Sequence, residues 1–308
     1  MKLPSGVQTQ RLDRVVTELL RSHGIEVSVR EVRAALKDGR IKIDGRRSSP
    51  SGTPSEGAPV ELDGFVARAE ALVAAEPELL DRVSILFEDG ELLFVAKPSG
   101  MPVAPLVPGE RGTLLGAAIA HCEAVAAAGP PLEGGLGHRL DVETSGVVVF
   151  AKDPETRKRL RSAFGGCEVD KRYLCLVKDP NARWSKVEVL STPLSGRGRR
   201  VAALEPGHRG LSAETEIHPR GDAQDGLRWL EARPRTGRRH QIRVHLASAG
   251  TAIVSDPLYG ELHPQVPRLA LHASALGLLG RPLVRAPLPP DLVGALVSLG
   301  FAPEVIAE

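Results

Sequence analysis

The stretch GHRLDVETSG at residues 137–146 leads directly into the apolar run VVVFA at residues 147–151. The second part is typical of a buried strand, so the first part is predicted to be a polar loop that enters it. Rigid scaffolds often present functional side chains on such loops. Asp141 is therefore a candidate catalytic carboxylate, although by spacing alone it is also typical of an ordinary turn aspartate.

A second stretch, RTGRRHQIRVHL, lies about a hundred residues later at 235–246. The spacing of Ile242, Leu246 and Ala249 predicts a helix with one apolar side. The preceding arginines would then lie near the positive end of the helix, which attracts anions. Charge alone does not distinguish this arrangement from an ordinary basic surface helix.

Together the two stretches resemble the RluA family of pseudouridine synthases. Further matching segments occur in the family's order: AKPSG at 96–100, KRY at 171–173, DPLYG at 256–260 and RLALHA at 268–273. The resemblance covers roughly residues 82 to 295. Two positions depart from the family pattern: Ser255 stands where glycine is common, and Arg239 occupies a variable position. Neither is a proposed catalytic group.

The resemblance implies an enzyme that breaks the uridine N1–C1′ bond in RNA, turns the base, and joins C5 to C1′ without any cofactor. Asp141 matches the family's essential aspartate, which acts either as a nucleophile toward the sugar or as a base. Tyr173 matches an active-site tyrosine that packs against the base, although a lone strand tyrosine more often serves the core.

The same resemblance gives Arg243 as the arginine that pairs with the aspartate and keeps it ionised, with Arg238 as a competing candidate. Arg139 would fill the space left by a flipped base or contact phosphate, unless it forms only a structural salt bridge. His138 is expected to shape the loop through hydrogen bonds rather than to act as a base.

Strand-like runs occur at residues 83–87, 92–96, 147–151, 173–177, 186–190, 213–218 and 227–232, with helices between them. This pattern predicts an α+β domain at residues 82–308, with a mixed, mostly antiparallel central sheet and flanking helices. The resemblance implies the pseudouridine synthase fold. The Ala-, Glu- and Leu-rich residues 64–81 are predicted to be a connecting helix or linker. Residues 195–210, rich in Gly and Arg, are predicted to be a mobile basic loop.

Residues 1–63 form a separate predicted module of two short helices followed by the hairpin sequence DGRIKIDG at 38–45. This order resembles the S4 RNA-binding module. Residues 30–47 contain seven basic and three acidic side chains, so the module is predicted to contact RNA phosphates, unless these are only solvated helix faces. The predicted contact residues are Arg30, Arg33, Lys37, Arg40 and Lys42.

Composition narrows the remaining classes. A hydrophobic fraction of 42% and a charged fraction of 25% are ordinary for a globular protein, and no apolar run approaches the roughly 20 residues of a membrane span. The three cysteines give no disulfide framework, which favours a reducing cytoplasm. Neither metal-ligand motifs nor nucleotide-cofactor loops occur, so no metal and no cofactor are expected.

Structured RNA is the expected partner, with ribosomal RNA favoured over transfer RNA because of the S4-like module; no obligate protein partner is evident. An aromatic content of 3% argues against a broad base-stacking platform. Two other functions remain open. One is an RNA-binding or RNA-folding protein without catalysis, which retention of Asp141, Tyr173 and Arg243 disfavours. The other is a nucleoside N-glycosidic hydrolase, which would not explain the S4-like module.

Overall fold

The computed structural model describes residues 1–7, 9–25, 27–65, 73–196, 200–205, 208–222 and 226–306. The chain divides into two compact units. The first comprises Met1–Ala74 with the short segments Pro105–Arg111 and Pro130–Gly134. The second comprises Ala75–Ala104, Gly112–Gly129 and Gly135–Glu308. Among the described residues, no helix combines the length and the apolar character needed to cross a membrane.

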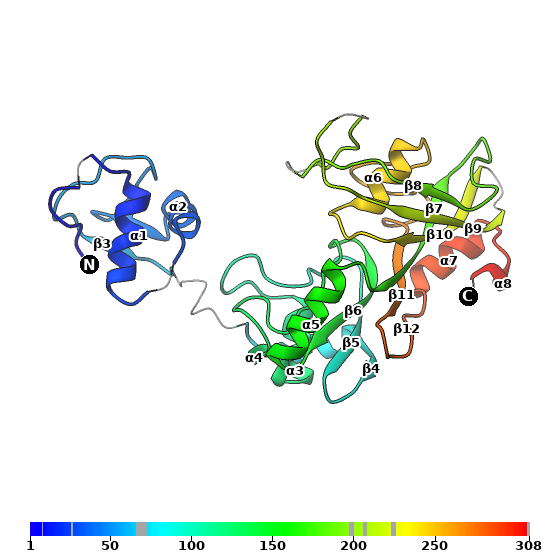
Figure 1. Ribbon diagram of the computed structural model, residues 1–308, viewed down its shortest axis with the longest axis horizontal. Helices are drawn as coiled ribbons and strands as arrows, with labels where there is room; N and C mark the ends of the chain where they lie inside the picture. Colours follow the sequence, from blue (N-terminus) through cyan, green and yellow to red (C-terminus); the bar gives the residue numbers. More distant parts are fainter. Residues whose placement is uncertain are drawn as a thin grey trace. The chain divides into compact units, whose positions relative to one another are not determined.

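The first unit contains the two helices and the hairpin that the sequence predicts (Figure 1). Helix α1 spans Leu12–Ser22 and α2 spans Val29–Asp38. A capping box between Ser28 and Glu31 begins α2, and Gly39, with φ +79°, ends it in the left-handed conformation. Strands β1 (Ile41–Ile43), β2 (Arg46–Arg47) and β3 (Val60–Leu62) form a sheet in the order β2-β1-β3.

The second unit is built on a sheet in the order β4-β5-β6-β11-β7-β10-β9-β8, with β12 beside β11. Its strands are β4 (Ser84–Glu88), β5 (Leu92–Lys97), β6 (Ser145–Ala151), β7 (Asp170–Lys178), β8 (Glu188–Leu190), β9 (Thr215–Asp222), β10 (Leu227–Pro234), β11 (Leu271–Gly277) and β12 (Val284–Arg285). Among the described strands of this sheet, β6 and β11 are the one parallel pair. The predicted mixed, mostly antiparallel sheet is therefore confirmed.

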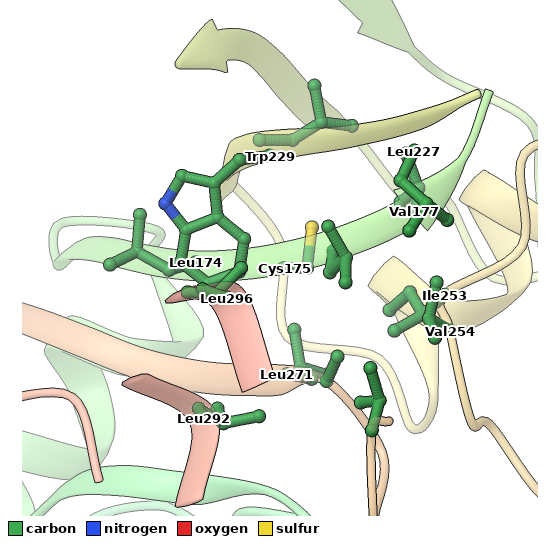
Figure 2. Close-up of a cluster of buried hydrophobic side chains, with 14 of the residues drawn as sticks. Leu174, Cys175, Val177, Leu227, Trp229, Ile253, Val254, Leu271, Leu292 and Leu296 are labelled. Carbon is green, nitrogen blue, oxygen red and sulfur yellow. The ribbon is translucent and has the colours of Figure 1, made fainter. Parts of the chain in front are cut away.

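Helices α5 and α7 bury apolar side chains against the sheet, and Figure 1 shows where these helices lie. Leu160 of α5 packs against β6, and Leu292 and Leu296 of α7 join a cluster with Trp229 of β10 and Leu174 of β7, as Figure 2 shows. The helical segments are η1 (Pro77–Arg82), α3 (Leu114–His121), α4 (Ala124–Ala127), α5 (Pro154–Gly165), α6 (Gln241–Ser248), α7 (Pro290–Ser298) and α8 (Pro303–Ile306).

The strand assignments differ in part from the sequence-based expectations. Strands β3, β11 and β12 were not predicted as strands, and β8 and β9 each begin two residues later than expected. Residues 66–72 of the predicted connector lie outside the described residues, and its described end contains only the 3₁₀ helix η1. Parts of the predicted basic loop, residues 197–199 and 206–207, also lie outside them.

Candidate active site

The loop that carries Asp141 closes as a turn immediately before β6, since the backbone N–H of Thr144 donates to the carbonyl of Asp141 at 3.1 Å. At the start of β6, Gly146 has φ +122°, and a Cβ atom there would lie 2.2 Å from the carbonyl oxygen of Ala273 on β11. Only glycine permits this close parallel pairing. The loop is therefore fixed relative to the middle of the sheet.

A second segment, AKPSG at 96–100, holds the same loop from the other side. Buried Lys97 donates from Nζ to the carbonyl of Val142 at 2.8 Å and to the carbonyls of Pro98 and Met101. The backbone N–H of Gly100 also donates to Val142, and Ser99 Oγ donates to the carbonyl of Glu143. Burial lowers the pKa of Lys97 to about 7, an effect that Glu143 partly opposes. Lys97 thus fixes the residue next to Asp141.

Arg243, on α6, connects the two sequence motifs. Its Nη1 donates to Asp141 Oδ2 at 2.7 Å, and its Nε and Nη2 make a bidentate pair with Asp256 at 2.8 and 2.7 Å. Asp256 is fully buried, whereas the side chain of Asp141 is 26% exposed. Asp256 also accepts the backbone N–H groups of Leu258 and Tyr259. Asp141 is therefore the member of this cluster that a substrate can reach.

Hydrogen bonding distinguishes the two oxygens of Asp141. Oδ2 takes the bond from Arg243, while no described group donates to Oδ1. Burial would lower the pKa of Arg243, but its bonds to Asp256 and Asp141 outweigh this effect and raise that pKa, so the guanidinium stays charged. Burial would likewise raise the pKa of Asp256, yet the bonds from Arg243 and from the backbone lower it. The site presents an anchored carboxylate with one oxygen unengaged by the described residues.

Strand register places Tyr173 near this loop. Ala273 of β11 is the partner of both Gly146 on β6 and Tyr173 on β7, so the three residues lie in one row across three strands. Two interstrand spacings of about 4.8 Å separate Tyr173 from the end of the Asp141 loop by roughly 10 Å. Burial raises the pKa of Tyr173, and the nearby charge of Asp141 adds to that effect. Its hydroxyl therefore remains protonated at neutral pH.

The two residues before Leu140 have different surroundings. Arg139 is exposed and bonds to no carboxylate in the described part of the chain, which disfavours its alternative reading as a structural salt bridge. His138 stacks on Phe164 of α5, with ring centroids 4.5 Å apart, and its Nε2 is buried without a hydrogen-bond partner among the described atoms. Burial lowers the pKa of His138 to about 3, so the ring is neutral.

The structure separates the two arginines that sequence left open. Arg238 precedes α6 and donates from Nε to the carbonyl of Ser212 at 2.9 Å, while Arg243 makes the bond to Asp141. The expectation of a helix with one apolar side was wrong. All residues from Gln241 to Leu246 are buried, and the polar ones have partners, such as Thr215 for both Gln241 and His245.

Three residues of the site escaped sequence reasoning as individual groups: Asp256, Tyr259 and His240. The hydroxyl of Tyr259 lies 2.8 Å from His240 Nδ1, and His240 Nε2 lies 3.9 Å from Asp141 Oδ2. Arg200, from the predicted basic loop, places its guanidinium 5.1 Å from the ring centre of Tyr259. The sequence did point to the DPLYG and TGRRHQ segments, which contain these residues, but the spacing of the segments does not reveal which side chains touch.

The RNA-contact residues predicted in the first unit fall into two groups. Arg30 and Lys37, both on α2, are exposed and bond to no carboxylate among the described residues. Each of the other three has an acidic partner: Arg33 bonds to Asp13 at 2.8 Å, Arg40 to Asp38 at 3.2 Å and Lys42 to Asp63 at 2.5 Å. Arg30 and Lys37 therefore carry the positive charge that is most available to a phosphate.

Comparisons with known proteins relate the whole chain to other sequences and folds. A family model described as RNA pseudouridylate synthase matches residues 91–248. The chain is 29% identical to the ribosomal large subunit pseudouridine synthase D of Pseudomonas aeruginosa, over 90% of this chain and 86% of that protein. It is 30% identical to the protein of that name from Xanthomonas campestris, over 96% and 91% of the two chains. A solved structure, human RNA pseudouridylate synthase domain containing 4, shares the fold with a TM-score of 0.58 at 24% identity, covering 72% of this chain and 94% of that one.

Proposed function

This chain belongs to the family of RNA pseudouridylate synthases and is an RNA pseudouridine synthase, and we propose that it isomerises a uridine of folded ribosomal RNA through Asp141. The observation that carries the assignment of Asp141 is its bond to Arg243, 2.7 Å long, in a loop that remains partly exposed. A buried cation that holds one carboxylate oxygen orients the other toward a bound nucleotide.

The chemistry requires one such carboxylate. The N1–C1′ bond breaks, C5 bonds to C1′, the C5 proton leaves, and N1 gains a proton, so atoms balance without any redox or group donor. Asp141 serves either as the nucleophile at the sugar or as the base that removes a sugar proton. In both routes Oδ1 is the reacting oxygen, because Oδ2 is engaged by Arg243.

Tyr173 and Arg139 complete the substrate pocket. The ring of Tyr173 packs against the extruded uracil, since aromatic faces are good partners for a flipped base. Arg139 is exposed two residues before Asp141, where its guanidinium fills the vacated position in the RNA stack or binds a neighbouring phosphate. No metal or cofactor takes part in this scheme.

We take residues 1–63 as an S4-like RNA-binding domain. Residues 64–81 join it to the catalytic domain at 82–308. Arg30 and Lys37 contact phosphates directly, and Arg33, Arg40 and Lys42 contribute more weakly because acidic neighbours share their charge. The relatives named ribosomal large subunit pseudouridine synthase favour ribosomal over transfer RNA. We propose that the enzyme acts on this substrate in the cytoplasm, without an obligate protein partner.

The test compares pseudouridine positions in total RNA, by chemical labelling and sequencing, from cells with the wild-type gene, a deletion, Asp141→Asn or Glu143→Gln. Glu143 is a matched control, because it is an exposed carboxylate in the same loop. We expect one or more ribosomal RNA positions to be lost in both the deletion and Asp141→Asn, and retained in Glu143→Gln.

Other outcomes identify which step fails. Loss confined to transfer RNA overturns the ribosomal assignment, and loss in the deletion alone overturns the role of Asp141. If no position changes in the deletion, an RNA-binding function without catalysis replaces the proposal. If the purified protein releases uracil from free uridine, the hydrolase alternative holds instead.

A further inference from the structure

The hydroxyl of Tyr259 lies between two nitrogen atoms whose roles can be assigned. The backbone N–H of Val201 donates to it at 2.9 Å, and His240 Nδ1 lies 2.8 Å from it. A backbone N–H can only donate, so the oxygen of Tyr259 accepts that bond. The hydroxyl oxygen could accept a second bond, but the described residues offer its proton no acceptor other than His240 Nδ1. The arrangement that satisfies this proton makes Nδ1 the acceptor and places the imidazole proton on Nε2.

That Nε2 proton faces the candidate catalytic carboxylate. His240 Nε2 is 3.9 Å from Asp141 Oδ2, and the His240 side chain is only 12% exposed. Burial lowers the pKa of His240, which Asp141 opposes; Arg243 and Arg239 also lower it, and Asp256 raises it. The net shift is downward, so at neutral pH an uncharged N–H group faces Asp141.

The backbone of His240 supports a role for the ring. The residue has φ +56° and ψ +17°, in the left-handed region, directly before α6. Glycine adopts this conformation at lower cost than histidine and asparagine adopts it as readily, so the backbone alone does not explain a histidine here. Residues in this region are retained at functional sites where the surroundings fix them. The ring, held by Tyr259, is the feature that distinguishes His240 from those alternatives.

We propose that His240 is a positioning residue for Asp141, with its Nε2–H donating to Oδ2 in the RNA complex and its tautomer fixed by Tyr259. The separation of 3.9 Å shortens to a hydrogen bond when RNA closes the site, as catalytic hydrogen bonds are often long without substrate. Two donors on Oδ2 then leave Oδ1 as the reacting oxygen. The inference rests on the proposed role of Asp141.

The first test reads the tautomer and needs no activity. Nitrogen NMR of the full chain labelled with ¹⁵N-histidine is recorded at pH 7 for the wild type, Tyr259→Phe and His240→Asn, the last variant assigning the His240 signals. We expect the Nε2–H tautomer in the wild type and a shift toward Nδ1–H in Tyr259→Phe. A wild-type Nδ1–H tautomer, or an imidazolium at pH 7, overturns the inference.

The second test measures single-turnover rates and RNA affinity. Asparagine tolerates the left-handed backbone but is too short to reach Asp141, so His240→Asn should lower the rate about 10- to 100-fold while the Kd for RNA stays within about twofold. Tyr259→Phe should lower the rate less, and His121→Asn, at a partly exposed position on α3, which carries no site residue, should not change it. A wild-type rate for His240→Asn refutes the positioning role.

The two readouts separate this inference from the proposed function. If Asp141→Asn keeps full activity while His240 shows the Nε2–H tautomer, the proposed role of Asp141 fails and the tautomer assignment stands. If Asp141→Asn is inactive but His240→Asn is not impaired, only the positioning role fails.

Discussion

Arg243 binds two carboxylates of unequal exposure: it makes a bidentate pair with fully buried Asp256 and a single bond of 2.7 Å with Asp141. One positive charge therefore serves both structure and the candidate catalytic group. Asp256 fixes the plane of the guanidinium, and the remaining Nη1 points at Asp141. Stability should consequently depend mainly on the Arg243–Asp256 pair, and activity on the Arg243–Asp141 bond.

Asp256→Asn should lower the free energy of unfolding by about 3 to 5 kcal/mol, because a buried arginine loses its charged bidentate partner. Asp141→Asn should lower it by less than about 1 kcal/mol, because Arg243 keeps Asp256 and position 141 reaches solvent. Urea unfolding at pH 7 measures both. Equal losses of unfolding free energy for the two variants would show that Asp141 contributes as much to stability as Asp256.

Lys97→Met should reduce the single-turnover rate about 10- to 100-fold with little change in RNA affinity. The substitution keeps an apolar chain of similar length but removes the donor that ties Val142, the neighbour of Asp141, to the AKPSG segment. Rapid-quench kinetics with saturating enzyme measure the rate, and exposed Lys186→Met is the control. An unchanged rate would mean that Gly100 and Ser99 hold the loop without Lys97.

Sequence predicted the sheet well where a buried strand is continuously apolar, and less well where a buried strand carries polar side chains. The run VVVFA is confirmed as β6, but the β11 sequence LHASALG was not predicted as a strand. Six of its seven residues are buried, among them His272 and Ser274, so polar side chains occupy positions that would otherwise reveal a core strand. Their acceptors lie on other segments, which a local pattern cannot show.

The motifs of the candidate site were found in the sequence, but only some of the contacts between their side chains were predicted. Asp141 and Arg243 are 102 residues apart, and the choice between Arg243 and Arg238 depends on where α6 begins. Since α6 begins at Gln241, Arg238 stays outside the helix and its side chain turns to Ser212. The acidic partners of Arg33 and Lys42 on neighbouring segments were equally invisible in the charge count.

Acid should destabilise the fold through His272, which bonds to Ser145 at the start of β6 and to the carbonyl of Ala286. Burial lowers the pKa of His272 to about 4, whereas an unfolded histidine titrates near 6.5. Between these values the unfolded chain binds the proton and the folded chain does not, so stability falls as pH falls from about 6.5 toward 4. The contribution lost between pH 7 and pH 5 is about 2 kcal/mol.

Urea unfolding at both pH values tests this dependence in the wild type and in His272→Gln. The variant removes the titrating group, so its loss of stability on acidification should be smaller by about 2 kcal/mol even if it is less stable at pH 7. Identical losses for the two proteins would assign the acid sensitivity to other groups, such as His138.

RNA affinity should depend on Arg30 and Lys37 more than on total charge. Each exposed cation that neutralises a phosphate releases about one counterion, so the double variant Arg30→Gln/Lys37→Gln should reduce the slope of log K against log salt by about 2. The control Lys2→Gln/Arg14→Gln removes the same charge from exposed positions of the same unit and should leave the slope nearly unchanged. Filter binding from 50 to 200 mM salt measures both. Equal reductions would mean that net charge, rather than the α2 surface, attracts the RNA.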